Sequence, residues 1–220
     1  MTPTLALIGK DPAAGSAKTR IAATLGRAVA RSIAEALVLD SADALLATAP
    51  AGARLVFYHD PPDAGPSLRA LGIPLRFDLV PQPAGTLGER LAHLSERELS
   101  AGASACVIAA IDSPFVLDPA ISACLPTTPG EIVLGPCEDG GYWAVGLDAP
   151  APAIFAVEMS TDDVLAETVA RGEALGRPVR LLPPMPDIDH AADLERAAAR
   201  GLLTRAPRTA LAWERASARS

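Results

Sequence analysis

Cysteine and histidine are scarce in this sequence, and the few present are poorly placed for metal or covalent chemistry. The 220 residues include three cysteines, Cys106, Cys124 and Cys137. They are widely separated, odd in number and free of CxxC spacing, which argues against a disulfide framework and a zinc knuckle. We expect all three to be reduced and structural. The three histidines share no metal-ligand spacing and no serine or cysteine nucleophile stands beside a base, so we expect surface histidines at His59, His93 and His190.

Excess positive charge and long hydrophobic runs are also missing. Nineteen Lys and Arg residues face 26 Asp and Glu residues, giving a net charge of -7 and a pI near 5.0. Such a balance argues against a general nucleic-acid binder, so any anion site must be local. The first apolar run, Leu5–Ile8, is too short for a signal peptide or a membrane span and follows no basic leader. We therefore expect a cytoplasmic protein with no nucleic-acid and no membrane partner.

Half of the residues are apolar, which is enough to bury a core in one ordinary domain. Short apolar runs typical of buried strands alternate with helical patterns. The strand-like runs are Leu5–Ile8, Leu55–Tyr58, Cys106–Ile111, Ile132–Leu134, Trp143–Leu147 and Val179–Leu182. The helical patterns are Gly26–Ala47, Leu87–Ala101, Thr161–Leu175 and Ala191–Arg200.

This alternation predicts an α/β fold, a single-domain three-layer α/β/α sandwich around a mostly parallel sheet. The 21 prolines are scattered at turns, and neither a linker nor a repeat is visible. We assign residues 1–205 to one domain and residues 206–220 to a C-terminal helical tail. Ligands in such sheets bind beyond the carboxyl ends of the strands, so functional residues should follow the strand-like runs.

A small-residue loop with three cations follows the first strand-like run, from Gly9 to Arg20. Its glycines allow close backbone approach, and Lys18 and Arg20 supply full charges for phosphate oxygens. The spacing differs from that of the Walker loop, so P-loop hydrolysis is not implied. The alternative is an ordinary solvated basic loop.

Carboxylates follow two later runs and suggest a divalent metal site. Asp112 stands at the exit of a central strand, where a hard cation such as Mg²⁺ or Mn²⁺ would find an oxygen ligand, although Asp before Ser-Pro is also a turn former. Asp187 and Asp189 flank Ile188, and alternation puts both acids on one side of an extended segment. One of them would complete the metal site while the other caps the following helix, or both would serve capping alone.

The most distinctive stretch is Gly135–Trp143, in which acids, two adjacent glycines and two aromatics occur together. It predicts either a wall of an acceptor site or a hairpin turn built on Asp139 and Gly140. Gln82 is a candidate for reading a base edge and Arg90 for meeting a phosphate or an acid. Ser160 is best explained as the N-cap of a helix with Asp163 in its first turn.

Five segments in this order resemble a bacterial glycosyltransferase-like family of the GT-A, or nucleotide-diphospho-sugar transferase, fold. That family is related to 2-phospho-L-lactate guanylyltransferase and to arsenosugar-biosynthesis and radical-SAM-associated transferases. The segments are Lys10–Arg20, Gln82–Arg90, Asp112–Pro114, Leu134–Gly146, and Ser160–Thr168 with Asp187–Leu194. Departures from the family pattern occur at Asp11, Ala14 and Met159.

The resemblance implies a role for each segment. Catalytic roles fall on Lys18, Asp112 and Asp139. The metal-binding positions are Asp112, Asp187 and Asp189, without a choice between the last two. The nucleotide-binding positions are Lys10, Gly15, Lys18, Arg20, Gln82, Gly88 and Arg90. The acceptor-side positions are Glu138, Asp139, Gly140, Gly141, Tyr142, Ser160 and Thr161.

The function expected is that of a metal-dependent nucleotidyltransferase, using Mg²⁺ or Mn²⁺. It would join a nucleoside triphosphate to a small phosphorylated or acidic acceptor and release pyrophosphate, because a triphosphate needs a strongly basic first loop. One alternative is a glycosyltransferase with a nucleotide-sugar donor, in which Asp139 would act as base. Another is a non-catalytic nucleotide-binding domain. A monomer or a homodimer is expected.

Overall fold

The sheet of this protein is mostly parallel, as the alternating pattern predicts. The computed structural model describes residues 2–115 and 121–218. Its seven described strands are ordered β3-β2-β1-β4-β6-β5-β7. Their bounds are β1 Thr4–Lys10, β2 Arg54–Asp60, β3 Phe77–Pro81, β4 Cys106–Ala110, β5 Ile132–Pro136, β6 Tyr142–Leu147 and β7 Val179–Leu181. β6 runs antiparallel to both of its neighbours, and the remaining pairings are parallel.

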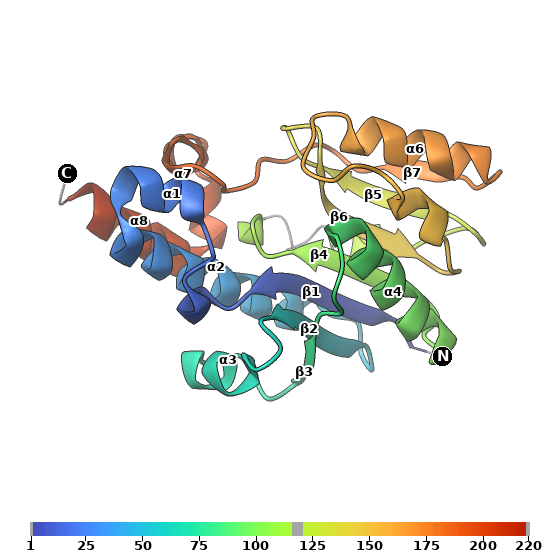
Figure 1. Ribbon diagram of the computed structural model, residues 1–220, viewed down its shortest axis with the longest axis horizontal. Coiled ribbons are helices and arrows are strands. Elements are labelled where there is room, and N and C mark those ends of the chain that lie inside the picture. Colours follow the sequence, from blue (N-terminus) through green and yellow to red (C-terminus); the bar gives the residue numbers. More distant parts are fainter. Residues whose placement is uncertain (1, 116–120, 219–220) are drawn as a thin grey trace.

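Helices cover both faces of this sheet (Figure 1). The described α-helices are α1 Thr19–Leu25, α2 Arg27–Thr48, α3 Gly65–Leu71, α4 Leu87–Ser100, α6 Val164–Ala174, α7 Ala191–Ala199 and α8 Pro207–Ser217. Short 3-10 turns are η1 Pro12–Ala14, η2 Ile121–Cys124, η3 Pro152–Phe155 and η4 Leu202–Arg205.

Alternate strand residues enter two separate cores, which confirms the predicted three-layer sandwich. Leu5 and Leu7 of β1 belong to the core under α2, α3 and α7. Ala6 between them belongs to the core under α4 and η3, against which α6 also packs. The strands are therefore apolar on both faces, as buried parallel strands are.

Most predicted elements are present, and the misses are short ones. α2 matches the predicted long helix, and its Ile33 and Leu37 are fully buried. α3 and β3 were not predicted from the sequence. α3 has only seven residues with Leu68 as its one buried residue, and β3 has only five with Phe77 as its one buried residue, so neither shows a repeated hydrophobic pattern.

His59 corrects the prediction of three surface histidines. It lies near the end of β2, is 2% exposed, and its Nδ1 is 2.9 Å from the Pro61 carbonyl oxygen. β2 is an inner strand covered on both faces, so even a polar side chain near its end is buried. His93 and His190 are exposed, as expected.

The C-terminal helix α8 packs closely against α2. Asp40 of α2 is 3% exposed and accepts hydrogen bonds from the backbone N and the Oγ1 of Thr209, both at 2.8 Å. Arg208 adds an ion pair to Asp43 at 2.6 Å. The buried carboxylate of Asp40 is thereby satisfied, which ties the chain's last helix to the rest of the fold.

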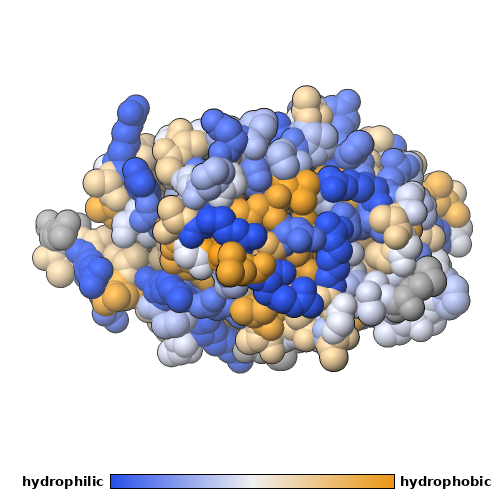
Figure 2. All heavy atoms as spheres, turned by 90° about the horizontal axis from the view of Figure 1, so that it is seen from below, coloured by the Kyte–Doolittle hydropathy of each residue, from blue (hydrophilic) through white to orange (hydrophobic). Residues whose placement is uncertain are grey.

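Apolar groups gather near the middle of the face on the side of α3 and β3, surrounded by polar groups (Figure 2). Leu75, which precedes β3, is 90% exposed. Among the described residues, no helix combines the length and the apolar character needed to cross a membrane.

Candidate functional site

The predicted functional segments meet at the carboxyl edge of the sheet. The loop after β1, Asp112 after β4, the turn between β5 and β6, and residues 186–190 border two neighbouring cavities. The larger has a volume of about 690 Å³ and the smaller about 300 Å³. Ile8, Arg20 and Asp189 line both, so the two cavities adjoin one another.

Lys18 is the central cation of this edge. Its Nζ lies 2.7 Å from Asp112 Oδ1 and 3.4 Å from Asp189 Oδ1, and it also donates to the carbonyl oxygen of Ile188. Burial opposes the charge on Lys18, but the neighbouring carboxylates of Asp112, Asp189 and Asp187 together outweigh burial, and the pKa of Lys18 is raised. All three donors of this ammonium therefore have protein oxygens beside them, and segments far apart in the chain converge on one charge.

The backbone conformation of the first loop positions Lys18. Asp11 is buried, and its Oδ1 accepts the backbone N–H of Ala13 at 3.0 Å, which holds the turn of η1. Lys18 has φ 50, and Ser160, which borders the larger cavity, has φ 71. These two are the positive-φ non-glycine residues in the described part of the chain. Both lie at the site, where strained backbone conformations are often found.

Arg20 and Lys10 are the exposed cations of the loop. Arg20 Nη1 lies 2.6 Å from Asp189 Oδ2, with the Arg20 side chain 61% exposed. Lys10 ends β1 and lines the smaller cavity together with residues 16–20. The smaller cavity is thus bordered by Lys10, Lys18 and Arg20 and by the carboxylates of Asp112 and Asp189.

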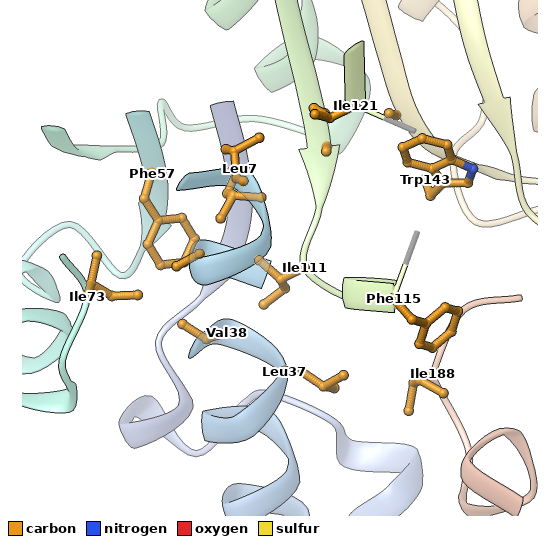
Figure 3. Close-up of a cluster of buried hydrophobic side chains, with 14 of the residues drawn as sticks. Leu7, Leu37, Val38, Phe57, Ile73, Ile111, Phe115, Ile121, Trp143 and Ile188 are labelled. Carbon is orange, nitrogen blue, oxygen red and sulfur yellow. The ribbon is translucent and has the colours of Figure 1, made fainter. Parts of the chain in front are cut away.

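The segment with Asp187 and Asp189 is held by the apolar residue between them. Ile188 is fully buried, points toward Phe115 (Figure 3), and donates its backbone N–H to the Asp112 carbonyl oxygen at 2.9 Å. Asp187 and Asp189 both line the larger cavity, as alternation predicts.

The predicted capping role of this segment is wrong for both acids. The N-cap of α7 is His190, and Asp193 caps the helix by accepting the backbone N–H groups of Asp189 at 2.8 Å and His190 at 2.5 Å. An acid three residues after the N-cap is the usual partner in a capping box, so Asp193 in the sequence could have located the start of α7 at His190.

Asp187 lies beside Asp139 and Cys137, a grouping that the sequence did not predict. One ligand atom from each of the three lies within 4.8 Å of the others. Burial, together with the charge of Asp139, raises the pKa of Asp187 to about 6. Burial also raises the pKa of the Cys137 thiol, which stays protonated. The donor set therefore fits a hard cation such as Mg²⁺ or Mn²⁺ through carboxylate oxygens and not through sulfur.

The distinctive stretch is a hairpin turn between β5 and β6, and it also borders the larger cavity. Asp139 Oδ1 accepts the backbone N–H of Gly141 at 3.0 Å. Gly140 has φ 92, and a Cβ there would lie 2.1 Å from the carbonyl oxygen of Asp162, so only glycine fits. The hairpin interpretation is therefore confirmed, and the acceptor-wall interpretation stays a prediction for a segment that lines the cavity. Lining residues from it are Glu138, Asp139, Gly141, Tyr142 and Trp143.

Ser160 and Thr161 also line the larger cavity, but the predicted cap at Ser160 is wrong. α6 begins at Val164, with Asp163 as its N-cap and no side-chain capping bond. Thr161 Oγ1 instead donates to the Glu158 carbonyl oxygen at 3.2 Å. Ser160, in the left-handed region, turns the chain along the cavity wall.

Other predicted positions lie beside the cavities without lining them. Gln82 donates to the carbonyl oxygens of Gly9 and Tyr58, both at 3.0 Å, and accepts from Arg90 at 2.9 Å. A Cβ on Gly88 would lie 2.2 Å from the Phe155 carbonyl oxygen, so Gly88 serves close packing. The predicted positions outside the residues that line either cavity are Gly15, Gln82, Gly88, Arg90 and Gly140.

Comparison with known proteins gives one family and many similar folds. A family model described as "Uncharacterized protein conserved in bacteria (DUF2064)" matches residues 33–161, which include Asp112 and the hairpin turn. No curated protein matches the sequence. A candidate nucleotide-diphospho-sugar transferase from Desulfovibrio desulfuricans G20 aligns with a TM-score of 0.82 at 24% identity, over 97% of this chain and 95% of that one.

Two further structures are less similar but span nearly the whole chain. The inositol-1-phosphate CTP transferase from T. maritima has a TM-score of 0.53 at 14% identity, covering 93% of this chain and 96% of that one. A CMP:2-keto-3-deoxy-manno-octonic acid synthetase complexed with CTP has a TM-score of 0.51 at 11% identity, covering 91% and 98%. The chain therefore belongs to the DUF2064 family and has the nucleotide-diphospho-sugar transferase fold, which confirms the resemblance identified in the sequence.

Proposed function

We propose that this chain is a divalent-metal-dependent nucleotidyltransferase that joins a nucleoside triphosphate to a small phosphorylated or acidic acceptor. One observation carries the proposal. The cationic loop after β1 meets Asp112 and Asp189 at a single point, through the contacts of Lys18 at 2.7 and 3.4 Å, between two adjoining cavities. The same fold is found in two proteins whose names include CTP, which supports a nucleotide as substrate.

In this proposal the smaller cavity receives the phosphates of the nucleotide. Lys10 and Arg20 line it, and their charges would offset those of the phosphate oxygens. Lys18 is ion-paired with the chain's own acids, so its proposed role is to hold Asp112 and Asp189 in position and to limit their mutual repulsion.

The proposed metal ligands are carboxylates of Asp112, Asp187 and Asp189, with Asp139 beside Asp187 as a further oxygen donor. A bound Mg²⁺ or Mn²⁺ would supply charge neutralisation for the phosphate oxygens and the leaving group. The larger cavity, which the hairpin turn and residues 160–162 border, would receive the acceptor.

The proposed reaction is a substitution at the α-phosphorus. An anionic oxygen of the acceptor forms a bond to this phosphorus, and the bond to the oxygen bridging the α- and β-phosphates breaks. Pyrophosphate leaves with the electron pair of that bond, and nothing is oxidised or reduced. The protein's part is to position the two substrates and to stabilise charge, without a covalent intermediate on the chain.

Glycosyl transfer from a nucleotide-sugar is the second candidate. It is favoured by the name of the structure with a TM-score of 0.82, a candidate nucleotide-diphospho-sugar transferase. Asp139, exposed at the hairpin turn and bordering the larger cavity, would then act as the base that accepts the acceptor's proton.

The leaving group distinguishes these functions. The protein is incubated with Mg²⁺ or Mn²⁺, a panel of nucleoside triphosphates or nucleotide-sugars, and a panel of phosphorylated and acidic acceptors, and the released products are quantified. We expect pyrophosphate, at a rate that falls by about 100-fold or more in the Asp112→Asn variant. Release of a nucleoside diphosphate from a sugar donor would overturn the proposal, and nucleotide binding without turnover would favour a non-catalytic domain.

A further inference from the structure

We propose that the larger cavity takes an acceptor with an apolar carbon skeleton rather than a sugar. The inference rests on the proposed function insofar as it makes this cavity the acceptor's site. It is carried by the distribution of side chains around the 690 Å³ cavity, which separates an apolar floor from a charged end.

The floor is built from the sheet face that looks toward α4. Three strands contribute Ile8, Ile108, Ala110 and Val145, none of which has a polar side-chain atom, and α4 adds Leu87 and Leu91. Ile108, Val145 and Leu91 belong to the same buried core, at 2%, 2% and 5% exposure. These core residues therefore also form part of the cavity wall, so this part of the wall is as apolar as the core.

Apolar side chains also stand at the rim on the α4 side, next to the polar residues 160–162 that line the same cavity. Leu87 begins α4, is 44% exposed and lines the cavity. Met159 is half-buried. Its methyl carbon would lie 3.4 Å from a Cβ on Gly88, which places it close to the residue after Leu87. Met159, one of the positions at which the sequence departs from the family pattern, thus lines this cavity.

Charged groups gather at the opposite end. Asp139, Asp187 and Asp189 line that end, together with Arg20 and Arg196. Arg20 is paired with Asp189, and Arg196 is paired with Asp193. A bound acceptor would place its reacting head group here, beside the proposed metal ligands.

Sugar hydroxyls would be poorly served by this arrangement. A ring with a hydroxyl on most carbons would lose hydrogen bonds to water over the floor and find no side-chain partner there. An apolar skeleton of similar size would instead gain from leaving water. The cavity volume lies within the usual range for small-molecule sites.

Cyclohexylmethanol and glucose test this inference directly. Both are uncharged six-membered rings with a hydroxymethyl group, and they differ in the ring oxygen and the ring hydroxyls of glucose. The protein has three methionines, so labelling the methionine methyl groups with ¹³C gives a simple NMR spectrum. Met159 reports on the larger cavity, and Met185, which packs against the other core, is the internal reference.

We expect cyclohexylmethanol to shift the Met159 signal saturably, with an affinity at least about tenfold higher than that of glucose. The Met185 signal should stay in place. An equal or stronger effect of glucose on Met159, or no effect of either compound, would overturn the inference.

Two variants check that the probe enters the cavity. Ala110→Leu adds bulk to the floor and should weaken cyclohexylmethanol binding by about tenfold or more, whereas Ala17→Leu, in the smaller cavity, should leave it unchanged. Leu87→Ser removes apolar surface at the exposed rim without touching the core, so it serves if Ala110→Leu fails to fold. Binding that persists in a folded Ala110→Leu protein and in Leu87→Ser would also sink the inference.

These measurements need neither nucleotide nor metal, so their outcome is independent of the pyrophosphate assay. Cyclohexylmethanol binding without pyrophosphate release would leave the apolar site standing while the nucleotidyl transfer fails. Pyrophosphate release with sugar phosphates as acceptors, and no binding of the apolar probe, would support nucleotidyl transfer and overturn the apolar acceptor site.

Discussion

Replacing Lys18 by methionine tests how the site is held together before any ligand binds. The lysine side chain is 6% exposed, while those of Asp112 and Asp189 are 37% and 39% exposed. Methionine keeps the length of the side chain and removes the charge, so two carboxylates would face each other across an apolar group. The substitution should therefore destabilise the folded protein.

The magnitude follows from the exposure of the partners. Removing one partner of a fully buried ion pair costs about 3–5 kcal/mol, and removing one from an exposed pair about 0–1 kcal/mol. A buried ammonium with two partly exposed acids lies between these limits, so we expect the free energy of unfolding to fall by about 2 kcal/mol. For a domain of this size that corresponds to a decrease in Tm of about 4–8 °C.

Urea unfolding at neutral pH, followed by circular dichroism, measures this difference. Lys10→Met, at an exposed position on the same loop, is the matched control and should change the free energy of unfolding by less than about 0.5 kcal/mol. In a double-mutant cycle, Asp112→Asn should cost less in the Lys18→Met background, with a coupling energy of about 1 kcal/mol. A Lys18→Met protein as stable as the wild type, or a cycle without coupling, would refute the ion-pair reasoning.

Three further predictions concern the fold. Asp40→Ala should lower the free energy of unfolding by about 2–3 kcal/mol, because it leaves the capping groups of α8 unsatisfied, and hydrogen exchange in α8 should accelerate. Gly140→Ala should cost about 2 kcal/mol or more in urea unfolding, because its Cβ would lie 2.1 Å from a carbonyl oxygen, whereas Gly15→Ala, with open space around it, should cost about 1 kcal/mol. Burial raises the pKa of Cys124 to about 12, and the pKa of Cys106 is raised as well, from an ordinary value of 9.0. The unfolded thiols ionise above this value while the folded ones keep their protons, so stability should fall as the pH rises from about 9 toward about 12. The fall should be less steep in Cys124→Ala, and a flat profile would contradict this.

The sheet and the location of the site could be predicted because they follow from short-range patterns. Runs such as Leu5–Ile8 are apolar at every position, which is typical of strands covered on both faces. The carboxyl ends of parallel strands share one edge, so the residues after β1 and β4 had to be neighbours. Hydrophobic alternation alone did not show the direction of β6, since it is the same in parallel and antiparallel strands. Only the hairpin interpretation of Gly135–Trp143 implied that β6 runs antiparallel to β5.

The contacts within the site depend on long-range geometry. The sequence indicates that Lys18 is cationic but not that its ammonium faces Asp189, 171 residues away, rather than a ligand. Likewise, the hairpin turn and the segment before α7 lie side by side, which brings Asp187 next to Asp139. No local sequence pattern predicts this contact. The apolar floor was also missed, because its residues come from three strands and one helix and look individually like core.

Mn²⁺ binding in the presence of a nucleoside triphosphate tests the central claim most directly. Free Mn²⁺ is measured by electron paramagnetic resonance for the wild type, Asp112→Asn, Asp189→Asn and the control Asp78→Asn, which lies on the exposed edge strand β3. We expect the two site variants to bind the metal–nucleotide complex at least about tenfold more weakly, with the control unchanged. Equal binding by all four proteins would contradict the claim that the loop after β1 and these two acids form one site.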